Sequence, residues 1–335
     1  MFLNNLRQHI SQKIVKWYLN NGRHDLPWRQ KVTPYRIWIS EIMLQQTQVK
    51  TATPYFKNFI KKYPTQKKLS EASEDQILAL WSGLGFYRRA RNIFKTKEII
   101  KEKYNNRFPK EFYQLLELPG IGKSTAGAIM SLAYQNPHPI LDGNVKRVIT
   151  RLVNKNIDLL KESQLWDLSS QFVNKENCFA YTQGIMDLGA TVCTPTNPSC
   201  KDCPLQNQCL SAFNTINNKK RNVAQLKKVI PMNLSLIQTE DSLLLVKNEA
   251  SSIWKNLWIP FESRSLESYT NSFKLTSSQK IQHELTHRRL NIKLNTYTST
   301  NESEIKTNKK YKWIKKDKIN EYGLPKPISK VINEL

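Results

Sequence analysis

The turn Leu118-Pro119-Gly120-Ile121-Gly122, followed by the helix-like run from Ser124 to Leu132, decides the fold of the first part of this chain. Proline fixes one φ angle of the turn, and Gly120 and Gly122 can adopt positive φ values that other residues avoid. The first turn of the helix that follows presents unpaired N–H groups, which suit an anion. A turn of this kind is common, so the rest of the chain must distinguish a structural turn from a phosphate clamp.

A carboxyl group follows at Asp142, between the apolar pair Ile140-Leu141 and the turn-forming pair Gly143-Asn144. An aspartate in such a place is often only a turn residue. Together with a backbone clamp for phosphate, it instead predicts an enzyme that acts on nucleic acid.

The composition supports a nucleic-acid partner. The 335 residues include 52 Lys and Arg against 27 Asp and Glu, a formal net charge of +25. This excess of positive charge favours a polyanionic binding partner. Nucleic acid is favoured over a membrane surface because no basic amphipathic anchor or lipidation motif is present. The sequence has no signal peptide and no run near the ~18 apolar residues of a membrane span. We expect a monomeric, cytoplasmic protein without a membrane partner, associated with the nucleoid if it is bacterial.

The length and patterning predict two domains. Helical spacing of apolar residues dominates the first part, a polar and basic stretch follows, and strand-like alternation begins near Met232. We expect a mainly α-helical domain over residues 1–213, a linker over 214–229 and a smaller α+β domain over 230–335.

An acid lies in one of the predicted helices. Thr33 and Pro34 predict its start, and Glu41 follows among apolar residues one turn away on either side. A carboxyl in apolar surroundings keeps its proton to higher pH and can serve as an acid. The alternative is that Glu41 faces water, as most helical glutamates do. The polar run 45–48 that follows has side chains suited to reading base edges.

A second polar segment combines glycines, aromatics and arginines. Gly83-Leu-Gly85-Phe86-Tyr87 precedes arginines at positions 88, 89 and 91. The aromatic rings could stack on bases while the arginines hold phosphates. A helix start with a solvated basic face is the equally open alternative.

Four of the five cysteines lie within 17 residues, at Cys193, Cys200, Cys203 and Cys209. In a reducing compartment this clustering favours a metal centre over disulfides. Four thiolates can enclose a zinc ion or an iron–sulfur cluster, and the spacing does not choose between them. Because four protein ligands leave no open position, we expect a structural centre. Cys178 lies outside the pattern and is expected to be a core thiol.

Together these motifs resemble the adenine DNA glycosylases of the MutY family, within the helix-hairpin-helix glycosylase superfamily. The resemblance is carried by Leu26-Pro-Trp-Arg29, Trp38-Ile-Ser-Glu41-Ile-Met-Leu-Gln-Gln-Thr-Gln48, Gly83-Leu-Gly85, the hairpin 118–127, Leu141-Asp-Gly-Asn-Val-Lys-Arg147, Met186-Asp-Leu-Gly189 and the cysteine run. It implies two helical lobes with the active site between them, and a [4Fe–4S] cluster held by the four cysteines.

The resemblance also implies the reaction, which is hydrolysis of the N-glycosidic bond of adenine mispaired with 8-oxoguanine or guanine in double-stranded DNA. The adenine must first leave the duplex. Glu41 matches the acid that protonates the base, Asp142 the carboxylate that stabilises the positive sugar, and Asn144 its assistant. An oxocarbenium-like transition state needs one protonated and one ionised group, and the polar turn after Asp142 is expected to keep it charged.

The residue at position 124 separates two related activities. Endonuclease III-type enzymes have a lysine there, whose amine attacks the sugar and allows strand cleavage. Ser124 cannot form a Schiff base, which favours a monofunctional glycosylase over an endonuclease III-like glycosylase and lyase. A non-catalytic DNA-binding protein is a third possibility, and it requires neither Glu41 nor Asp142.

Further contacts to DNA are predicted from the motifs and the resemblance. They are Trp28, Arg29, Leu44 and Gln183 at the adenine pocket, Gln46, Thr47 and Phe86 near the opposite base, Tyr87 among the aromatics that could stack on bases, and Gly120 and Gly122 at the backbone. Phe86 stands where the family usually has a tyrosine, so the ring is kept but its hydroxyl is lost.

The C-terminal domain resembles the family's Nudix-like module, which helps to recognise the oxidised guanine. The resemblance rests on Leu243-Leu-Leu-Val246, Ile253-Trp-Lys-Asn-Leu-Trp-Ile-Pro-Phe261 and His283-Glu-Leu-Thr-His287. Thr286 and His287 keep the hydroxyl and imidazole of the family's Phe-Ser-His motif but not its ring. The glutamate-rich metal-binding helix of Nudix hydrolases is missing after Phe261, so we expect no nucleotide hydrolysis.

Overall fold

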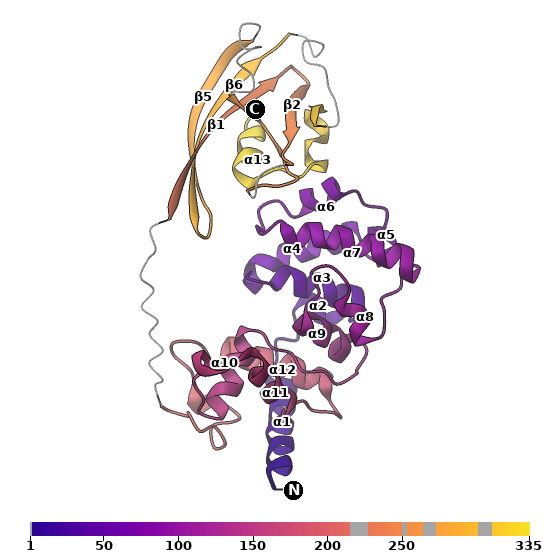
Figure 1. Cartoon of the computed structure of the whole chain (residues 1–335), viewed down its shortest axis with the longest axis vertical. Helices are drawn as coiled ribbons and strands as arrows, with labels where there is room; N and C mark the ends of the chain where they lie inside the picture. Colours follow the sequence, from indigo (N-terminus) through magenta and orange to yellow (C-terminus); the bar gives the residue numbers. More distant parts are fainter. Residues whose placement is uncertain (1, 215–226, 250–252, 264–272, 301–309) are drawn as a thin grey trace. The chain divides into compact units, whose positions relative to one another are not determined.

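The computed structural model describes residues 2–214, 227–249, 253–263, 273–300 and 310–335 (Figure 1). The chain divides into two compact units, one of residues 1–71 and 95–218, the other of residues 72–94 and 219–335. The predicted linker over 214–229 falls mostly on 215–226, outside the described residues. In the described part of the chain, no helix is long and apolar enough to cross a bilayer.

The first unit consists of helices, as the spacing of its apolar residues predicts. Its helices are α1 (Phe2–Asn21), α2 (Pro27–Gln30), α3 (Pro34–Leu44), α4 (Val49–Lys62), α5 (Gln66–Leu69), α8 (Phe112–Leu116), α9 (Lys123–Ala133), α10 (Gly143–Leu152), α11 (Glu162–Ser170) and α12 (Cys178–Thr191), with 3-10 turns η1 (Ile157–Leu159) and η2 (Cys200–Asp202). Helix α7 (Arg88–Tyr104) starts in the second unit and ends in the first. Helix α12 contacts α1, α9 and α10, while α3 packs on α9 and α4.

The predicted start of helix α3 is confirmed. Thr33 has an extended backbone, and its side chain accepts a hydrogen bond from the N–H of Arg36, while Pro34 occupies the first helical position. This is the arrangement that satisfies an otherwise orphaned N–H group at a helix start. The helix ends at Leu44, so Glu41 lies in its last turn.

The turn before helix α9 has a positive φ at one of its two glycines. Gly120 has a φ of +83°, as expected, whereas Gly122 has a φ of −89° and is the extended residue that precedes the helix. Of the two glycines that can adopt a positive φ, only Gly120 does so. A Cβ atom added there would meet no atom within 4 Å, so this side of the helix start is open.

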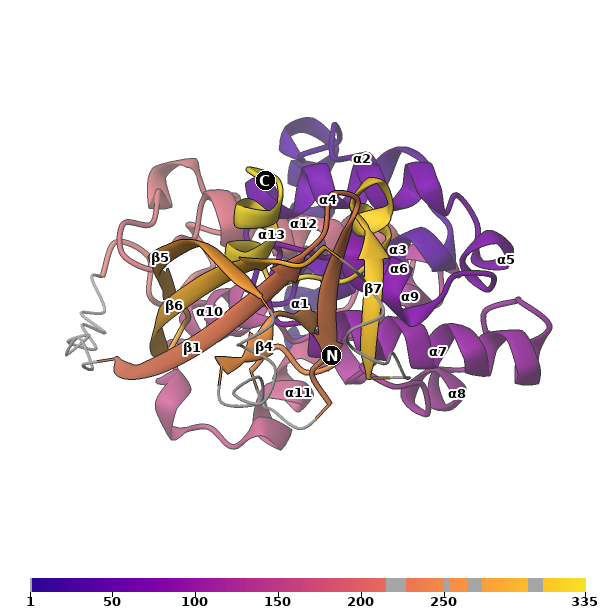
Figure 2. The ribbon, with the colours of Figure 1, turned by 90° about the horizontal axis from the view of Figure 1, so that it is seen from above.

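The second unit contains a sheet with the strand order β3-β2-β1-β6-β5, and among the described residues the sheet has seven strands. The strands are β1 (Lys228–Gln238), β2 (Ser242–Lys247), β3 (Trp258–Ile259), β4 (Phe261–Glu262), β5 (Lys274–Glu284), β6 (Arg288–Thr298) and β7 (Tyr311–Lys315). Strands β1 and β6 run parallel, and β5 and β6 form a long antiparallel hairpin (Figure 2). Off the main path, β4 pairs with β1 and β7 with β2.

Helical segments complete this unit and confirm the predicted α+β class. They are α6 (Glu74–Leu80), the 3-10 segment η6 (Lys316–Glu321) and α13 (Lys326–Ile332). Helix α6 contacts η6, although the two are far apart in the sequence. A core of Ile237, Leu244, Phe261 and Phe273 packs within the unit. Residues 72–94 thus belong with the C-terminal residues rather than with the helices that flank them in sequence.

Candidate active site

Asp142 caps helix α10 with its carboxyl group. Its Oδ1 accepts a hydrogen bond from the N–H of Val145 at 2.7 Å, and the helix begins at Gly143. The sequence predicts a polar turn here, and the structure makes that turn the first turn of a helix. One step back, the N–H of Leu141 donates to Oγ of Ser124 at 3.0 Å, which ties the residue before Asp142 to helix α9.

Two opposing effects act on the pKa of Asp142. Burial raises it, whereas hydrogen bonds from the N–H groups of Val145 and Asn144, the charge of Arg147 and the Asn144 side chain lower it. Burial outweighs the others, so the pKa of Asp142 lies above its usual value. The polar turn therefore limits the rise in the pKa without cancelling it.

Glu41 is close enough to Asp142 for their charges to interact. The pKa of Glu41 is raised to about 7, mainly by burial and also by the negative charge of Asp142, while the positive charge of Arg29 opposes the rise. The two carboxyls and Arg29 therefore belong to one site in the helical unit. The environment of Glu41 is the one expected from its apolar neighbours, and a carboxyl with this pKa holds its proton for much of the time at neutral pH.

Arg29 is fixed by a buried acid, Asp187 of helix α12. Its two terminal nitrogens contact the Asp187 carboxylate at 2.6 and 2.8 Å. Arg23 binds the same carboxylate through its backbone N–H and its guanidinium group. Burial alone would raise the pKa of Asp187, but the two arginines outweigh it and lower the pKa.

The role of Asp187 was missed at the sequence level, although it lies in one of the motifs that carry the resemblance. Its side chain is 0% exposed in a helix of mostly apolar residues. An acid in such a helix signals a buried ion pair, because an unpaired charge there would be very unfavourable. The partners, 158 and 164 residues away in sequence, could not be identified from the helix itself.

The other predicted pocket residues lie in the same unit. Trp28 and Gln183 are buried, with 4% and 2% of their surfaces exposed. The Trp28 ring meets Phe56 edge-on at 5.4 Å between ring centroids. Leu44 is half-buried at the end of helix α3, and Gln46 just beyond it is exposed with a φ of +56°. Thr47 is half-buried and its N–H donates to the carbonyl of Leu44 at 3.2 Å.

Phe86 and Tyr87 belong to the second compact unit. Phe86 is 45% exposed and Tyr87 is half-buried. Arg89, which the sequence presents as a phosphate contact, is instead buried, and its guanidinium group lies 5.4 Å from the ring centroids of both Trp81 and Phe86. It also donates to the carbonyl of Gly85 at 3.2 Å. Arg89 therefore supports the loop and does not face solvent.

Thr286 and His287 form the exposed tip of the β5–β6 hairpin. The N–H of Leu285 donates to the carbonyl of Arg288 at 2.8 Å and closes the turn. Glu284 pairs with Arg289 across the base of the turn, and Lys227 contacts the same acid at 2.8 Å. The turn thus presents a hydroxyl and an imidazole to solvent.

Helix α10 connects Asp142 to the cysteine run. Arg147 donates to Oδ1 of Asn144 at 2.8 Å, to the carbonyl of Gly189 at 2.6 Å and to the carbonyl of Cys193 at 2.7 Å. Gly189 of helix α12 allows Asn144 of helix α10 to lie close to it, because a Cβ atom on residue 189 would be only 2.6 Å from Cβ of Asn144. One arginine therefore links the first turn of α10 to the start of the cysteine run.

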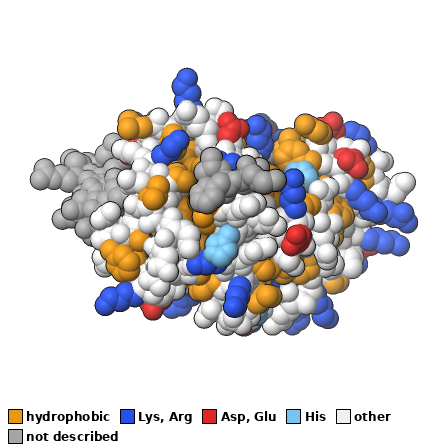
Figure 3. Space-filling view, turned by 90° about the horizontal axis from the view of Figure 1, so that it is seen from below, with side chains coloured by type: hydrophobic (Ala, Val, Ile, Leu, Met, Phe, Trp, Pro, Cys, Tyr) orange, Lys and Arg blue, Asp and Glu red, His pale blue; other side chains and the backbone are white. Residues whose placement is uncertain are grey.

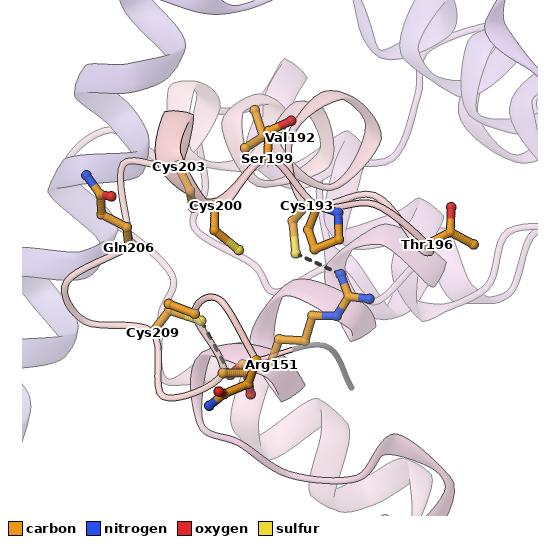
Figure 4. Close-up of a pocket in the computed structure, with 13 residues that line it drawn as sticks. Arg151, Val192, Cys193, Thr196, Ser199, Cys200, Cys203, Gln206 and Cys209 are labelled. Atoms are coloured by element: carbon orange, nitrogen blue, oxygen red, sulfur yellow. Dashed lines mark hydrogen bonds between the residues drawn. The ribbon is translucent and has the colours of Figure 1, made fainter. Parts of the chain in front are cut away.

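The cysteine run surrounds a pocket. Cys193, Cys200, Cys203 and Cys209 all line it, together with Arg151 (Figure 4). The guanidinium group of Arg151 lies 3.4 Å from Sγ of Cys193 and 2.7 Å from the carbonyl of Thr194. The five cysteines, all within the described residues, are free of disulfides, and Cys178 is buried apart from the pocket, as expected.

The described residues contain no group of three or more His, Cys, Asp or Glu side chains that could hold a single metal ion. The four thiols nevertheless converge on one pocket. Four thiols that line one pocket are a donor set suited to an iron–sulfur cluster or to a zinc ion.

Positive charge is spread widely over the surface. Lys and Arg side chains are scattered over the face seen in Figure 3, with fewer acidic side chains between them, in agreement with the net charge of +25. Scattered cations attract a polyanion from many directions without specifying a sequence.

We expect replacement of Asp187 by asparagine to destabilise the helical unit by about 3 kcal/mol, because it leaves the buried guanidinium group of Arg29 without its countercharge. Urea unfolding at neutral pH measures this loss. Asp167→Asn, at an exposed position of helix α11, is the matched control and should unfold like the wild type. Equal stability of the Asp187 variant and the wild type would contradict this account of the ion pair.

Two family models match this chain, one in its helical part and one in its C-terminal part. The model for the HhH-GPD superfamily of base excision DNA repair proteins matches residues 39–164, and the model for the NUDIX domain matches residues 233–334. A thermostable thymine-DNA glycosylase of known structure is similar with a TM-score of 0.57 at 28% identity, over 62% of this chain and 96% of that one. Endonuclease III in complex with DNA has a similar fold, with a TM-score of 0.54 at 22% identity over 62% of this chain and 96% of that chain.

Proteins named adenine DNA glycosylase are similar to this chain, in one case over almost its whole length. The adenine DNA glycosylase of Buchnera aphidicola subsp. Schizaphis graminum is 40% identical over 342 residues, which span 96% of this chain and 97% of that protein. The human adenine DNA glycosylase is 38% identical over 208 residues, or 58% of this chain and 38% of the human protein. This chain therefore belongs to the adenine DNA glycosylase family, with a helix-hairpin-helix glycosylase domain followed by a Nudix domain.

Proposed function

We propose that this protein is a monofunctional DNA glycosylase that removes adenine mispaired with 8-oxoguanine or guanine. The observation that carries the proposal is the pair of interacting carboxyls, Glu41 with a pKa of about 7 and Asp142 at the first turn of helix α10. Family membership supports the adenine substrate. The mispair, the residue roles and the absence of lyase activity are our inference.

In the proposed reaction, protonated Glu41 donates its proton to the ring of the flipped adenine, which then leaves as a neutral base. Positive charge develops on the sugar as the N-glycosidic bond breaks, and ionised Asp142 stabilises it. Water then adds to the sugar and gives up a proton to the Glu41 carboxylate, which restores the acid. The half-buried setting of Asp142 supports this role, because a charge interaction is stronger where water is partly excluded.

Asn144 and Arg147 support the proposed role of Asp142. The N–H and side chain of Asn144 and the charge of Arg147 all lower the pKa of Asp142 against the effect of burial. Arg147 also holds Oδ1 of Asn144 at 2.8 Å, which fixes that side chain next to the carboxyl. We infer that these residues keep Asp142 ionised when the sugar becomes positive.

We infer that the adenine enters next to Trp28, Leu44 and Gln183. Arg29, which is held by Asp187, limits the rise in the pKa of Glu41 through its positive charge. Gln46, Thr47, Phe86 and the hairpin tip at Thr286 and His287 are the proposed contacts to the opposite base. The open side of Gly122 supports close approach of a DNA phosphate to the start of helix α9. Tyr87 and Gly120 then contribute to DNA binding by fixing the backbone conformation of the turns to which they belong.

We further propose that Cys193, Cys200, Cys203 and Cys209 hold a [4Fe–4S] cluster. The convergence of four free thiols on one pocket supports the cluster, which when bound ties the C-terminal end of the helical unit together. Its proposed role is structural. The monomeric state and the cytoplasmic location stay predictions.

The proposed activity is tested by incubating the protein with duplexes that carry adenine opposite 8-oxoguanine, or an oxidised pyrimidine, and by analysing the strands with and without hot alkali. Strand breakage at the adenine only after alkali is expected, since Ser124 provides no amine to cleave the strand. Breakage at the pyrimidine without alkali would identify a bifunctional glycosylase and lyase. Binding without any breakage would identify a non-catalytic DNA-binding protein.

The rate of adenine release should depend on pH in a manner set by Glu41. Its acid form is required, so above a pH of about 7 the rate should fall as the proton is lost, approaching tenfold per pH unit. Ionised Asp142 is also required, and its raised pKa should lower the rate at acidic pH. Single-turnover rates from about pH 5 to pH 9 measure the profile. A rate that stays constant above pH 7 would exclude this role.

Glu41→Gln is the companion variant, because it keeps the size of the side chain and removes the proton. It should bind the mispaired duplex like the wild type and release adenine at least about a hundredfold more slowly. Retained turnover in this variant would remove Glu41 from the acid's role.

Replacement of Cys203 by serine should remove the cluster. The wild type is expected to contain about four irons per chain, and the variant should lose most of this iron together with its visible absorption. Cys178→Ser is the matched control, because that thiol lies outside the pocket and should leave the iron content unchanged. One zinc and no iron per wild-type chain would contradict the proposed cluster.

A further inference from the structure

Helix α6 is attached to the C-terminal sheet by a shared acid. Oδ1 of Asp75 accepts hydrogen bonds from Nε1 of Trp258 and from Nζ of Lys247, each at 3.1 Å. Trp258 and Lys247 are paired residues of strands β3 and β2. The neighbouring acid, Glu74, accepts from Nδ2 of Asn256 at 3.0 Å. The first turn of α6 therefore rests on the β2–β3 edge and on the loop before it.

A second set of contacts lies at the other end of α6. Oγ of Ser82 donates to the carbonyl of Leu324 at 2.9 Å. Gly323 lies against the side chain of Leu78 so closely that a Cβ atom on the glycine would be 2.5 Å from Cβ of Leu78. Arg91 at the start of helix α7 donates to the carbonyl of Lys255 at 2.9 Å. Both ends of the segment 72–94 are thus held by the C-terminal sheet domain.

The loop between these contacts, residues 83–87, has an unfavourable backbone. Gly83 and Gly85 have φ values of +92° and +78°, and Phe86 has a φ of +50°. A positive φ is unusual for an aromatic residue and persists only where the surroundings impose it. The loop is held from within by Nε1 of Trp81, which donates to the carbonyl of Gly85 at 3.0 Å.

The C-terminal domain adds a restraint at each end of this loop. Ser82, which precedes the loop, and Tyr87, its last residue, both point a hydroxyl at the carbonyl of Leu324, at 2.9 and 3.4 Å. The side chain between them, Phe86, remains 45% exposed. The loop 83–87 thus exposes the ring of Phe86, and its backbone conformation is restrained at both ends by Leu324 of the C-terminal domain.

We infer that the C-terminal sheet domain sets mispair specificity by holding the 83–87 loop, with Asp75 and Ser82 as positioning residues. This inference rests on the proposed function and adds to it. The C-terminal domain recognises the base opposite the adenine in two ways, by its own hairpin tip and by fixing the ring of Phe86. Neither Asp75 nor Ser82 touches the DNA or the reacting atoms.

The test compares Asp75→Asn and Ser82→Ala with the wild type in the full-length protein with its cluster. Single-turnover rates are measured on duplexes with adenine opposite 8-oxoguanine and opposite guanine. The rate opposite 8-oxoguanine should fall about fivefold in each variant, while the rate opposite guanine stays within about twofold. Asp75→Asn removes the negative charge that strengthens the bonds from Lys247 and Trp258, and Ser82→Ala removes the bond to Leu324. The preference for the lesion then falls by a similar factor.

Two variants of the same sheet domain serve as matched controls. Glu249→Gln removes a carboxylate from an exposed ion pair with Lys310, and Ser278→Ala removes a hydroxyl that bonds Asn295 on the exposed face of strand β5. Both controls should keep the wild-type preference for the lesion. Trp258→Phe removes a donor to Asp75, and combined with Asp75→Asn it should reduce the preference no further than either change alone.

A purely stabilising contact would give a different result. In that case Asp75→Asn and Ser82→Ala would lower the melting temperature but keep the ratio of the two rates, and the inference would be wrong. An equal fall of both rates would also overturn it. If the wild type releases adenine from neither duplex, the proposed function itself fails, and an unchanged ratio in an active enzyme refutes only the positioning role.

Discussion

The hydrogen bond from the N–H of Val145 to the carboxyl of Asp142 is the contact on which the rest of the site depends, because it fixes both an acid and a helix. A carboxylate is favourable at a helix start, where unpaired N–H groups carry partial positive charge. The helix that begins here carries Arg147 and Arg151, which bind carbonyl groups of the cysteine run. The carboxylate that is proposed to stabilise the sugar and the cysteine pocket are therefore linked by one helix.

The proposed reaction needs one protonated and one ionised carboxyl, and the two carboxyls of this site differ in the neighbours that set their pKa values. Burial raises the pKa of both, and what distinguishes them is the set of neighbours. Asp142 is surrounded by N–H groups and Arg147, which favour its charged form, whereas Glu41 has the charge of Asp142 beside it, which disfavours its own. Because the groups interact, ionisation of Asp142 helps Glu41 to keep its proton. The division of roles thus follows from the contacts of Asp142.

Much of this could be predicted from the sequence where the signal is local. The cap at Thr33, the end of helix α3 and the apolar surroundings of Glu41 depend on residues within one or two turns, and the structure agrees with them. Contacts between distant segments could not be predicted. Asp187 finds its arginines about 160 residues away, and Arg89 is buried by rings whose positions follow from the tertiary fold. The parallel pairing of strands β1 and β6 has the same origin, since each strand was recognisable but its partner was not.

Ser124 contributes to the site in two ways, because it lacks an amine and because it forms a hydrogen bond with the backbone of Leu141. Its hydroxyl accepts the N–H of Leu141, so it fixes the backbone immediately before Asp142. A lysine at this place would carry an amine on a long, flexible side chain. Its ammonium form could not accept the hydrogen bond from the N–H of Leu141. In the proposed reaction the serine therefore leaves no amine near the sugar, and it gives the buried backbone a partner. This agrees with a site in which the two carboxyls carry the proposed chemistry and in which a main-chain N–H group fixes the position of Asp142.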